Sequence, residues 1–248
     1  MYKRKSRIIL LILTLFSLLF PVSSLAANVL YDEDILNELY EIVLEGENRI
    51  YLDLKGTRIF FDESLENIYI SDELEYDRRG GRLNIYYPRK SIYELFDNDH
   101  LIVVGTKNPF RIIDIDAGGI SLAGNLTADE MKINAGGINM HGEYHVDEMR
   151  INGAGIDIRG SFDTEYVRIN GAGVSLDLDI ASLQNINING VGIDADLKYT
   201  DIWTGTREVS VNGIGGNVNI MLRKDNIDEN GNIKLNKNGI IGTEVNYY

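Results

Sequence analysis

A short sequence recurs along the middle of the chain, at first at a constant interval of 18 residues. The first copy reads Ile-Asp-Ala-Gly-Gly-Ile, and the third reads Ile-Asn-Gly-Ala-Gly-Ile. The six copies begin at Ile115, Ile133, Ile151, Ile169, Ile188 and Val211, the last two after longer spacings of 19 and 23 residues. A fixed period near twenty residues is typical of proteins in which each unit stacks only on its neighbours. The repeat therefore predicts a solenoid.

Apolar residues within each copy are spaced as in β-strands. In the third copy they include Ile156 and Ile158, which are two residues apart, and later Phe162 and Val167. Strand side chains alternate with a period of two, whereas a helix would show a period of 3.6. Glycine-rich segments between these positions supply turns. We therefore expect an all-β fold, a single-stranded β-helix with coils of 18 residues and an irregular N-terminal β segment.

Polar residues and glycines recur at fixed positions in the copies and predict structural columns. Asparagine takes the second position in five copies, and identical amides stacked at the strand spacing can hydrogen-bond along the stack. The predicted asparagine ladder is Asn134, Asn152, Asn170, Asn189 and Asn212. Glycine takes the fifth position in every copy, which predicts one shared backbone conformation at that corner. The predicted glycine column is Gly119, Gly137, Gly155, Gly173, Gly192 and Gly215.

Charged residues recur later in the copies. Asp129, Asp147 and Glu165 are expected to form an acidic stripe. A basic stripe, three positions further on, is expected from Lys132, Arg150 and Arg168. Exposed pairs between two such stripes would each contribute less than about 1 kcal/mol.

The two ends of the chain differ from the repeats. Basic residues, the apolar run from Ile8 to Phe20 and a small-residue exit predict a cleaved signal peptide over residues 1–26. The apolar run is shorter than the roughly 20 residues that span a bilayer. We expect an N-terminal β segment or cap at 27–110, β-helix repeats at 111–222, and a C-terminal β cap at 223–248 whose residues 232–247 resemble a hairpin.

The N-terminal segment contains one helical pattern and several strand patterns. A weak amphipathic helix is expected from Asp34 to Val43. Strands are expected at Ile50 to Leu54, Arg58 to Phe61, Asn67 to Ile70 and Leu83 to Tyr87, with turns at Lys55-Gly56 and Arg79-Gly80-Gly81.

Charge and composition exclude several partners. The chain has 38 acidic and 24 basic residues, a net charge of −14, and four of the basic residues lie in the predicted signal peptide. Such a surface is unfavourable for nucleic acid or anionic lipid. The chain has no cysteine, so it forms no disulfide. We expect a secreted or cell-envelope protein that contacts a membrane only through its signal peptide.

The coil sequence resembles a known family. Met149 to Ile158 reads hydrophobic-x-Ile-Asn-Gly-Ala-Gly-Ile-x-Ile, and the alternating segments Asn48 to Asp53 and Gly81 to Tyr87 precede the repeats. This pattern resembles the secreted bacterial β-strand-repeat domains called "putative adhesins", a domain family of unknown function. The resemblance covers about Glu45 to Met221. It implies a β-solenoid at the cell surface, with no catalytic residues to transfer.

Calcium binding is the first alternative considered, because Asn152 to Ile158 looks like half of a calcium β-roll repeat. The column that would supply aspartates instead reads Ser121, Asn139, Asp157, Ser175 and Asp194. Calcium takes six to eight oxygen ligands, and this column is short of carboxylates. A second candidate loop, Asn226 to Ile233, has Lys237 where a bidentate glutamate is needed. We therefore expect no metal site and no cofactor.

A polysaccharide-cleaving β-helix is the enzymatic alternative. Such enzymes need a cluster of carboxylates with a basic residue inside one groove, whereas the charges here lie at regular offsets of a narrow coil. The three histidines, His100, His141 and His145, form no recognisable triad or metal-binding spacing. We expect no catalytic residues and no enzyme activity.

An aromatic insertion precedes the last copy. Tyr199, Trp203 and Arg207 lie in it or beside it and are candidate partner-binding residues, because aromatic side chains can stack on a sugar or a protein. The alternative is that these residues cap the coil stack.

The expected function is that of an exported, non-enzymatic surface or envelope protein, an adhesin or scaffold that presents a rigid face to a protein or glycan partner. Self-assembly is the alternative, because an uncapped solenoid end carries an unpaired strand edge.

Overall fold

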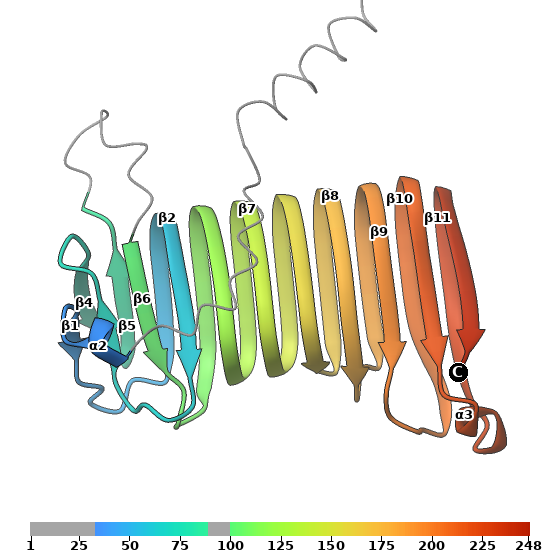
Figure 1. The fold of residues 1–248 in the computed structure, drawn as a ribbon, viewed down its shortest axis with the longest axis horizontal. Coiled ribbons are helices and arrows are strands. Elements are labelled where there is room, and N and C mark those ends of the chain that lie inside the picture. Colours follow the sequence, from blue (N-terminus) through green and yellow to red (C-terminus); the bar gives the residue numbers. More distant parts are fainter. Residues whose placement is uncertain (1–32, 89–99) are drawn as a thin grey trace, which may run out of the picture. The chain divides into compact units, whose positions relative to one another are not determined.

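The structure is a computed structural model that describes residues 33–88 and 100–248 (Figure 1). The predicted signal peptide, residues 1–26, lies outside the described residues. The described chain is nearly all β, as the sequence predicts. Its elements are α2 (Glu33–Leu36), β1 (Tyr40–Ile42), β2 (Arg49–Asp62), β3 (Ile68–Ile70), β4 (Glu75–Arg79), β5 (Arg82–Tyr86), β6 (His100–Gly105), β7 (Phe110–Asp163), β8 (Tyr166–Ala181), β9 (Asn185–Tyr199), β10 (Gly205–Leu222), α3 (Asp225–Asp228) and β11 (Gly231–Tyr247).

The strands form one open sheet in the order β1-β3-β6-β2-β7-β8-β9-β10-β11. From β7 to β11 neighbouring strands are parallel, and from the third copy to the sixth each first residue lies beside the first residue of the next copy. Ile151 pairs with Ile169, Ile169 with Ile188, and Ile188 with Val211. The alignment of the copies in the sequence is thus the register of the sheet. The longer insertion between the last two copies leaves this register intact.

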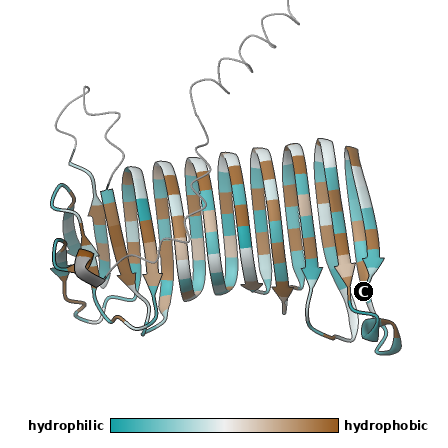
Figure 2. Cartoon of the chain, in the orientation of Figure 1, coloured by the Kyte–Doolittle hydropathy of each residue, from teal (hydrophilic) through white to brown (hydrophobic). Residues whose placement is uncertain are grey.

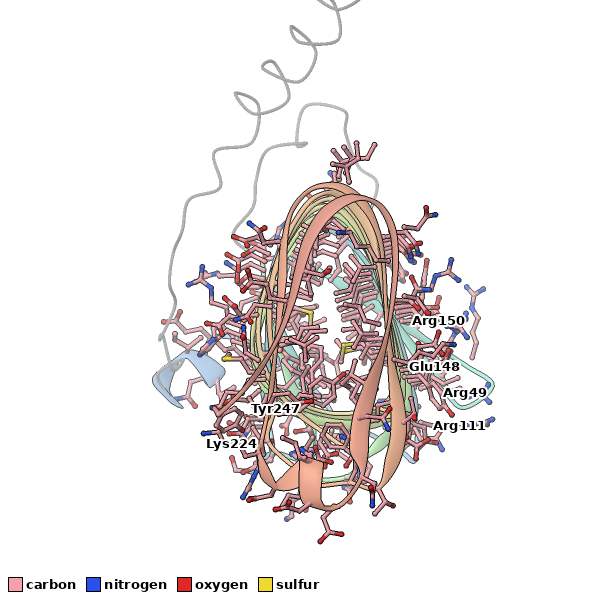
Figure 3. All side chains as sticks on the ribbon, turned by 90° about the vertical axis from the view of Figure 1, so that its right-hand side faces the viewer. Arg49, Arg111, Glu148, Arg150, Lys224 and Tyr247 are labelled. Carbon is pink, nitrogen blue, oxygen red and sulfur yellow. The ribbon has the colours of Figure 1, made fainter. Side chains whose placement is uncertain are left out.

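The core lies inside the turns of the ribbon. Viewed end-on, the ribbon follows a flattened oval whose interior is filled by side chains (Figure 3). Ile133, Ile151 and Ile169 are fully buried there. The rings of Tyr144 and Phe162 pack edge to face, with centroids 5.7 Å apart. Alternating residues point outward, so the surface carries the polar bands visible in Figure 2.

The C-terminal segment is a strand of the same sheet, and the expected hairpin at 232–247 is wrong. β11 pairs in parallel with β10 from Gly205↔Gly231 to Leu222↔Tyr247. Its resemblance to a copy is weak because Lys237 takes the place of Val211 and Thr243 that of Val218.

The expected N-terminal helix is also wrong. Only Glu33–Leu36 is helical, and Tyr40–Ile42 is the strand β1, which pairs with β3. Short apolar runs fit either a helix or a strand, and pairing with β3 decides in favour of the strand.

β2 behaves as a further copy of the repeat. The two strands expected at Ile50 to Leu54 and Arg58 to Phe61 are one continuous strand, so the expected turn at Lys55-Gly56 is wrong. This strand lies in parallel register on the start of β7. On its other side, β2 pairs in parallel with β5 and β6. The chain therefore runs alongside β2 twice. It forms β5 and β6 on one side of β2 and then the start of β7 on the other.

Antiparallel strands cover the outer edges of β5 and β6. β4 pairs with β5 through a turn in which Gly80 and Gly81 have positive φ, as expected from the sequence. β3 pairs with β6, and β1 with β3. None of the helices among the described residues has the length and apolarity needed to cross a membrane.

Candidate functional site

The three candidate partner-binding residues of the aromatic insertion are buried, which favours the alternative that they cap the coil stack. Tyr199 is fully buried, Trp203 is 8% exposed and Arg207 is 4% exposed. The guanidinium of Arg207 lies 4.2 Å from the centre of the Trp203 ring and forms a two-pronged ion pair with Asp201. Stacking and pairing hold these side chains against the core, so they cap the stack and are not free for a partner.

The helix α3 completes this cap. Asn226 is fully buried; its side-chain oxygen accepts a hydrogen bond from the Trp203 backbone N–H at 2.9 Å, and its side-chain nitrogen donates to the Asp201 carbonyl at 3.2 Å. Asn226 is the first residue of the second candidate calcium loop. Its side chain is therefore used to join the insertion to α3.

The three histidines lie in different surroundings. His141 and His145 are exposed, and His145 Nδ1 lies 3.5 Å from Asp163 Oδ2. His100 is buried beside Tyr87, with ring centroids 5.0 Å apart. Within residues 33–88 and 100–248, no three histidine or carboxylate side chains are grouped so that they could hold a metal ion.

The asparagine column forms a continuous chain of side-chain hydrogen bonds on the surface. Asn134 donates to Asp116, Asn152 to Asn134, Asn170 to Asn152, Asn189 to Asn170 and Asn212 to Asn189, each at 2.7–2.8 Å. Each amide thus donates to the previous copy, and Asn134, Asn152, Asn170 and Asn189 also accept from the next. This arrangement ties neighbouring copies together at one position.

Tyr51 of β2 ends the ladder. Its hydroxyl donates to Asp116 Oδ2 at 2.9 Å, while Asp116 Oδ1 accepts from Asn134. Burial, and then the Asp116 carboxylate, raise the pKa of Tyr51 to about 12. The phenol therefore stays protonated and continues to donate at neutral pH.

The glycine column at the fifth position does not share one strained conformation, so that expectation is wrong. Gly192 and Gly215 have positive φ, whereas Gly119, Gly137, Gly155 and Gly173 do not. A Cβ placed on Gly155 would meet no atom within 4 Å. This corner is open to solvent and does not require glycine for space.

A second glycine column, which was not predicted from the sequence, leaves no room for a Cβ. Gly124, Gly142 and Gly160 have φ of +100°, +149° and +139°. A Cβ on Gly160 would lie 2.0 Å from the carbonyl oxygen of Gly142, and one on Gly142 would lie 1.9 Å from that of Gly124. The signal was present, since these glycines are also 18 residues apart.

The charged stripes pair differently from the expectation. Lys132 and Arg150 form ion pairs with Glu130 and Glu148, which lie two residues before them in the same strand. No basic side chain among the described residues lies within 4.0 Å of the carboxylates of Asp129, Asp147 or Glu165. These three carboxylates are exposed.

We call Asp129, Glu130, Asp147, Glu148 and Glu165 the acidic flank. They line an open groove of about 390 Å³, together with Arg111 and Tyr166. Figure 3 shows Glu148, Arg150, Arg111 and Arg49 on one side of the oval. Because side chains of parallel copies repeat at about 4.8 Å, the three unpaired carboxylates of Asp129, Asp147 and Glu165 offer closely spaced negative charges to a cationic partner.

Solved structures include chains with a similar fold. A crystal structure of a "putative adhesin" from Bacteroides fragilis aligns with a TM-score of 0.53 at 12% identity, covering 85% of this chain and 96% of that chain. A "putative lipid binding protein" from Parabacteroides distasonis aligns with a TM-score of 0.45 at 13% identity, and a "putative adhesin" from Parabacteroides merdae with 0.42 at 12%. Each alignment covers 85% of this chain, with 96% and 95% of the respective other chains.

At this identity the first of these similarities concerns the fold alone. No family model and no curated protein matches the chain.

Proposed function

We propose that this chain is a single-stranded β-helix that acts as a non-enzymatic, exported surface protein of the adhesin-like kind. The in-register parallel pairing of consecutive copies supports the β-helix, as does the fold similarity to the Bacteroides fragilis protein. The predicted signal peptide supports export.

The functional proposal rests on one observation: most repeated residues have a structural task, but three repeated carboxylates do not. Inward aliphatic side chains fill the core, Asn134 and its equivalents link the copies, and Gly160 and its equivalents allow close approach of the backbone. The carboxylates of Asp129, Asp147 and Glu165 have no such partner among the described residues. They remain free for recognition.

The acidic flank favours a partner that displays regularly spaced cationic groups, on a protein or on an amine-bearing glycan. Rigid strands hold the carboxylates in place, so little ordering is needed on binding. Because Trp203 is buried, it is not available to recognise a partner. The charge of the acidic flank is then the main source of affinity for that partner.

The test compares two variants that remove the same number of charges. Asp129→Asn, Asp147→Asn and Glu165→Gln together neutralise the three unpaired carboxylates of the acidic flank, whereas Asp177→Asn, Asp194→Asn and Glu229→Gln neutralise exposed carboxylates elsewhere. Binding to isolated bacterial cell-wall material is measured at about 0.05 and 0.5 M salt, where screening differs strongly. At the lower salt concentration we expect the flank variant to bind at least about tenfold more weakly than the unmodified protein. We expect a loss of similar size for the unmodified protein at the higher salt concentration, since screened charge pairs lose most of their attraction.

Equal losses in the two triple variants would show that only net charge matters and would contradict recognition at the flank. Turnover of a purified polysaccharide that is lost on removing one carboxylate would overturn the non-enzymatic assignment.

A further inference from the structure

The two ends of the strand stack differ in how their outer strand edges are paired. At one end, β4 and β3 pair in antiparallel fashion with the outer edges of β5 and β6. At the other end, β11 pairs with β10, and no strand of the described chain pairs with its outer edge (Figure 1). About half of the backbone N–H and C=O groups of an edge strand point outward without a partner. β11 thus presents an unpaired edge of 17 residues.

The side chains of β11 are covered on one side only. Val245 is 39% exposed and Tyr247 is 46% exposed, although their register partners Ile220 and Leu222 are fully buried. Ile233 and Leu235 on the opposite side of the oval are partly buried against the core. The end of the stack is therefore an apolar surface bordered by free hydrogen-bonding groups.

This edge is held rigidly. Tyr248 N–H donates to the Leu222 carbonyl at 2.9 Å, its carbonyl accepts from Lys224 N–H at 3.1 Å, and its hydroxyl donates to the Tyr199 carbonyl at 3.1 Å. A strand fixed in this way loses little conformational freedom when another strand is added.

Charge also singles out β11. The whole chain has a net charge of −14, but β11 carries two lysines, Lys234 and Lys237, and one acidic residue, Glu244. It also contains four asparagines, at positions 232, 236, 238 and 246. Two copies would repel each other through their acidic flanks, and β11 itself adds no net negative charge to that repulsion.

We propose that the outer edge of β11 pairs in antiparallel fashion with β11 of a second copy of this chain, forming a dimer with twofold symmetry. At the opposite end the outer edges of β5 and β6 are already paired, and the edge strands there among the described residues are short: β1 has three residues and β4 has five. An interface that uses the same surface twice closes as a dimer and does not extend into a fibre.

The path of β11 around the oval suits this symmetry. A twofold axis through the turn at Ile240 places residues 231–238 of one copy over residues 242–248 of the other. Leu235 then faces Val245 of the second copy, so that the exposed apolar residues of the two ends cover each other. The dimer does not depend on the proposed function, since it leaves the acidic flank accessible.

The absence of cysteine allows a direct test with single cysteine variants. Ile240 is 78% exposed and lies on the axis, where antiparallel strands bring facing Cα atoms to about 5 Å, within the range of a disulfide. Ile214 is 60% exposed and is the register partner of Ile240 in β10. Its two copies would be three strand spacings apart, about 14 Å, which is too far.

Under mild oxidation Ile240→Cys is expected to become covalently dimeric, and Ile214→Cys to remain at the background level. The unmodified protein is expected to show twice the monomer mass by light scattering at about 0.1 mM, where weak association is populated. A monomer mass at that concentration would overturn the proposal. Equal cross-linking of the two cysteine variants would also overturn it, because random collision would then explain both.

Discussion

Gly160→Ala is expected to destabilise the protein by at least about 3 kcal/mol, because the new Cβ would overlap the preceding copy and the backbone would be strained. The Cβ would lie 2.0 Å from the Gly142 carbonyl oxygen and 3.0 Å from the Gly142 nitrogen and carbonyl carbon. All three are backbone atoms in a parallel strand pair, so they cannot move away without breaking the register. Urea unfolding at neutral pH measures the change in the free energy of unfolding.

Gly155→Ala is the matched control, five residues away in the same copy. Gly155 has no positive φ, and its Cβ would meet nothing within 4 Å. Its free energy of unfolding should change by no more than about 0.5 kcal/mol. Similar effects of the two substitutions would contradict the assignment of the tight column to Gly124, Gly142 and Gly160.

The second large effect is expected for Asp201→Ala. The Arg207 side chain is 5% exposed, and Asp201 accepts from both of its terminal nitrogens, at 2.8 and 2.6 Å. Removing the carboxylate leaves a buried guanidinium without its counter-charge, which costs about 3–5 kcal/mol. A large fall in the thermal midpoint is the expected readout.

Asp225→Ala breaks a comparable contact at the surface. Asp225 pairs with Arg223 at 2.8 Å, but both side chains are at least 40% exposed. Its removal should cost less than about 1 kcal/mol. If Asp201→Ala were as mild, the Arg207 pair could not be part of the structural cap.

The sequence is sufficient to predict the β-structure and the register of the copies. Period and alternation determine which side chains point inward, as at Ile151 and Ile169, because slipping by one residue would expose the core positions. The asparagine positions were also recognisable, since amides at one position of successive copies meet only if the copies stack.

Other features depend on contacts that a repeat pattern does not contain. The side of the backbone on which the next copy lies decides that Gly160 is crowded and Gly155 is open. The sequence left two roles open for the insertion, because Trp203 can contact a partner or the core, and the buried contact with Asn226 decides in favour of the core. β11 was missed because an end strand tolerates Lys237 and Thr243 where an inner strand has valine.

The N-terminal topology was the least predictable part. β2 lies between β7 and the pair β5 and β6, which follow it in sequence. Local patterns identify such strands but not their neighbours, since the same apolar residues would be buried if the strands were paired in a different order.

The central claim is that consecutive copies stack in register as coils of a β-helix, and paired cysteines test it most directly. Arg159 and Asp177 are exposed Cα partners in neighbouring strands, and Asp196 is the exposed partner of Asp177 in the strand after that. The account predicts that Arg159→Cys with Asp177→Cys forms an intramolecular disulfide, because about 4.8 Å separates their Cα atoms. Arg159→Cys with Asp196→Cys, at about twice that distance, should not form one. Efficient bond formation in the second pair and not in the first would contradict the coil stack.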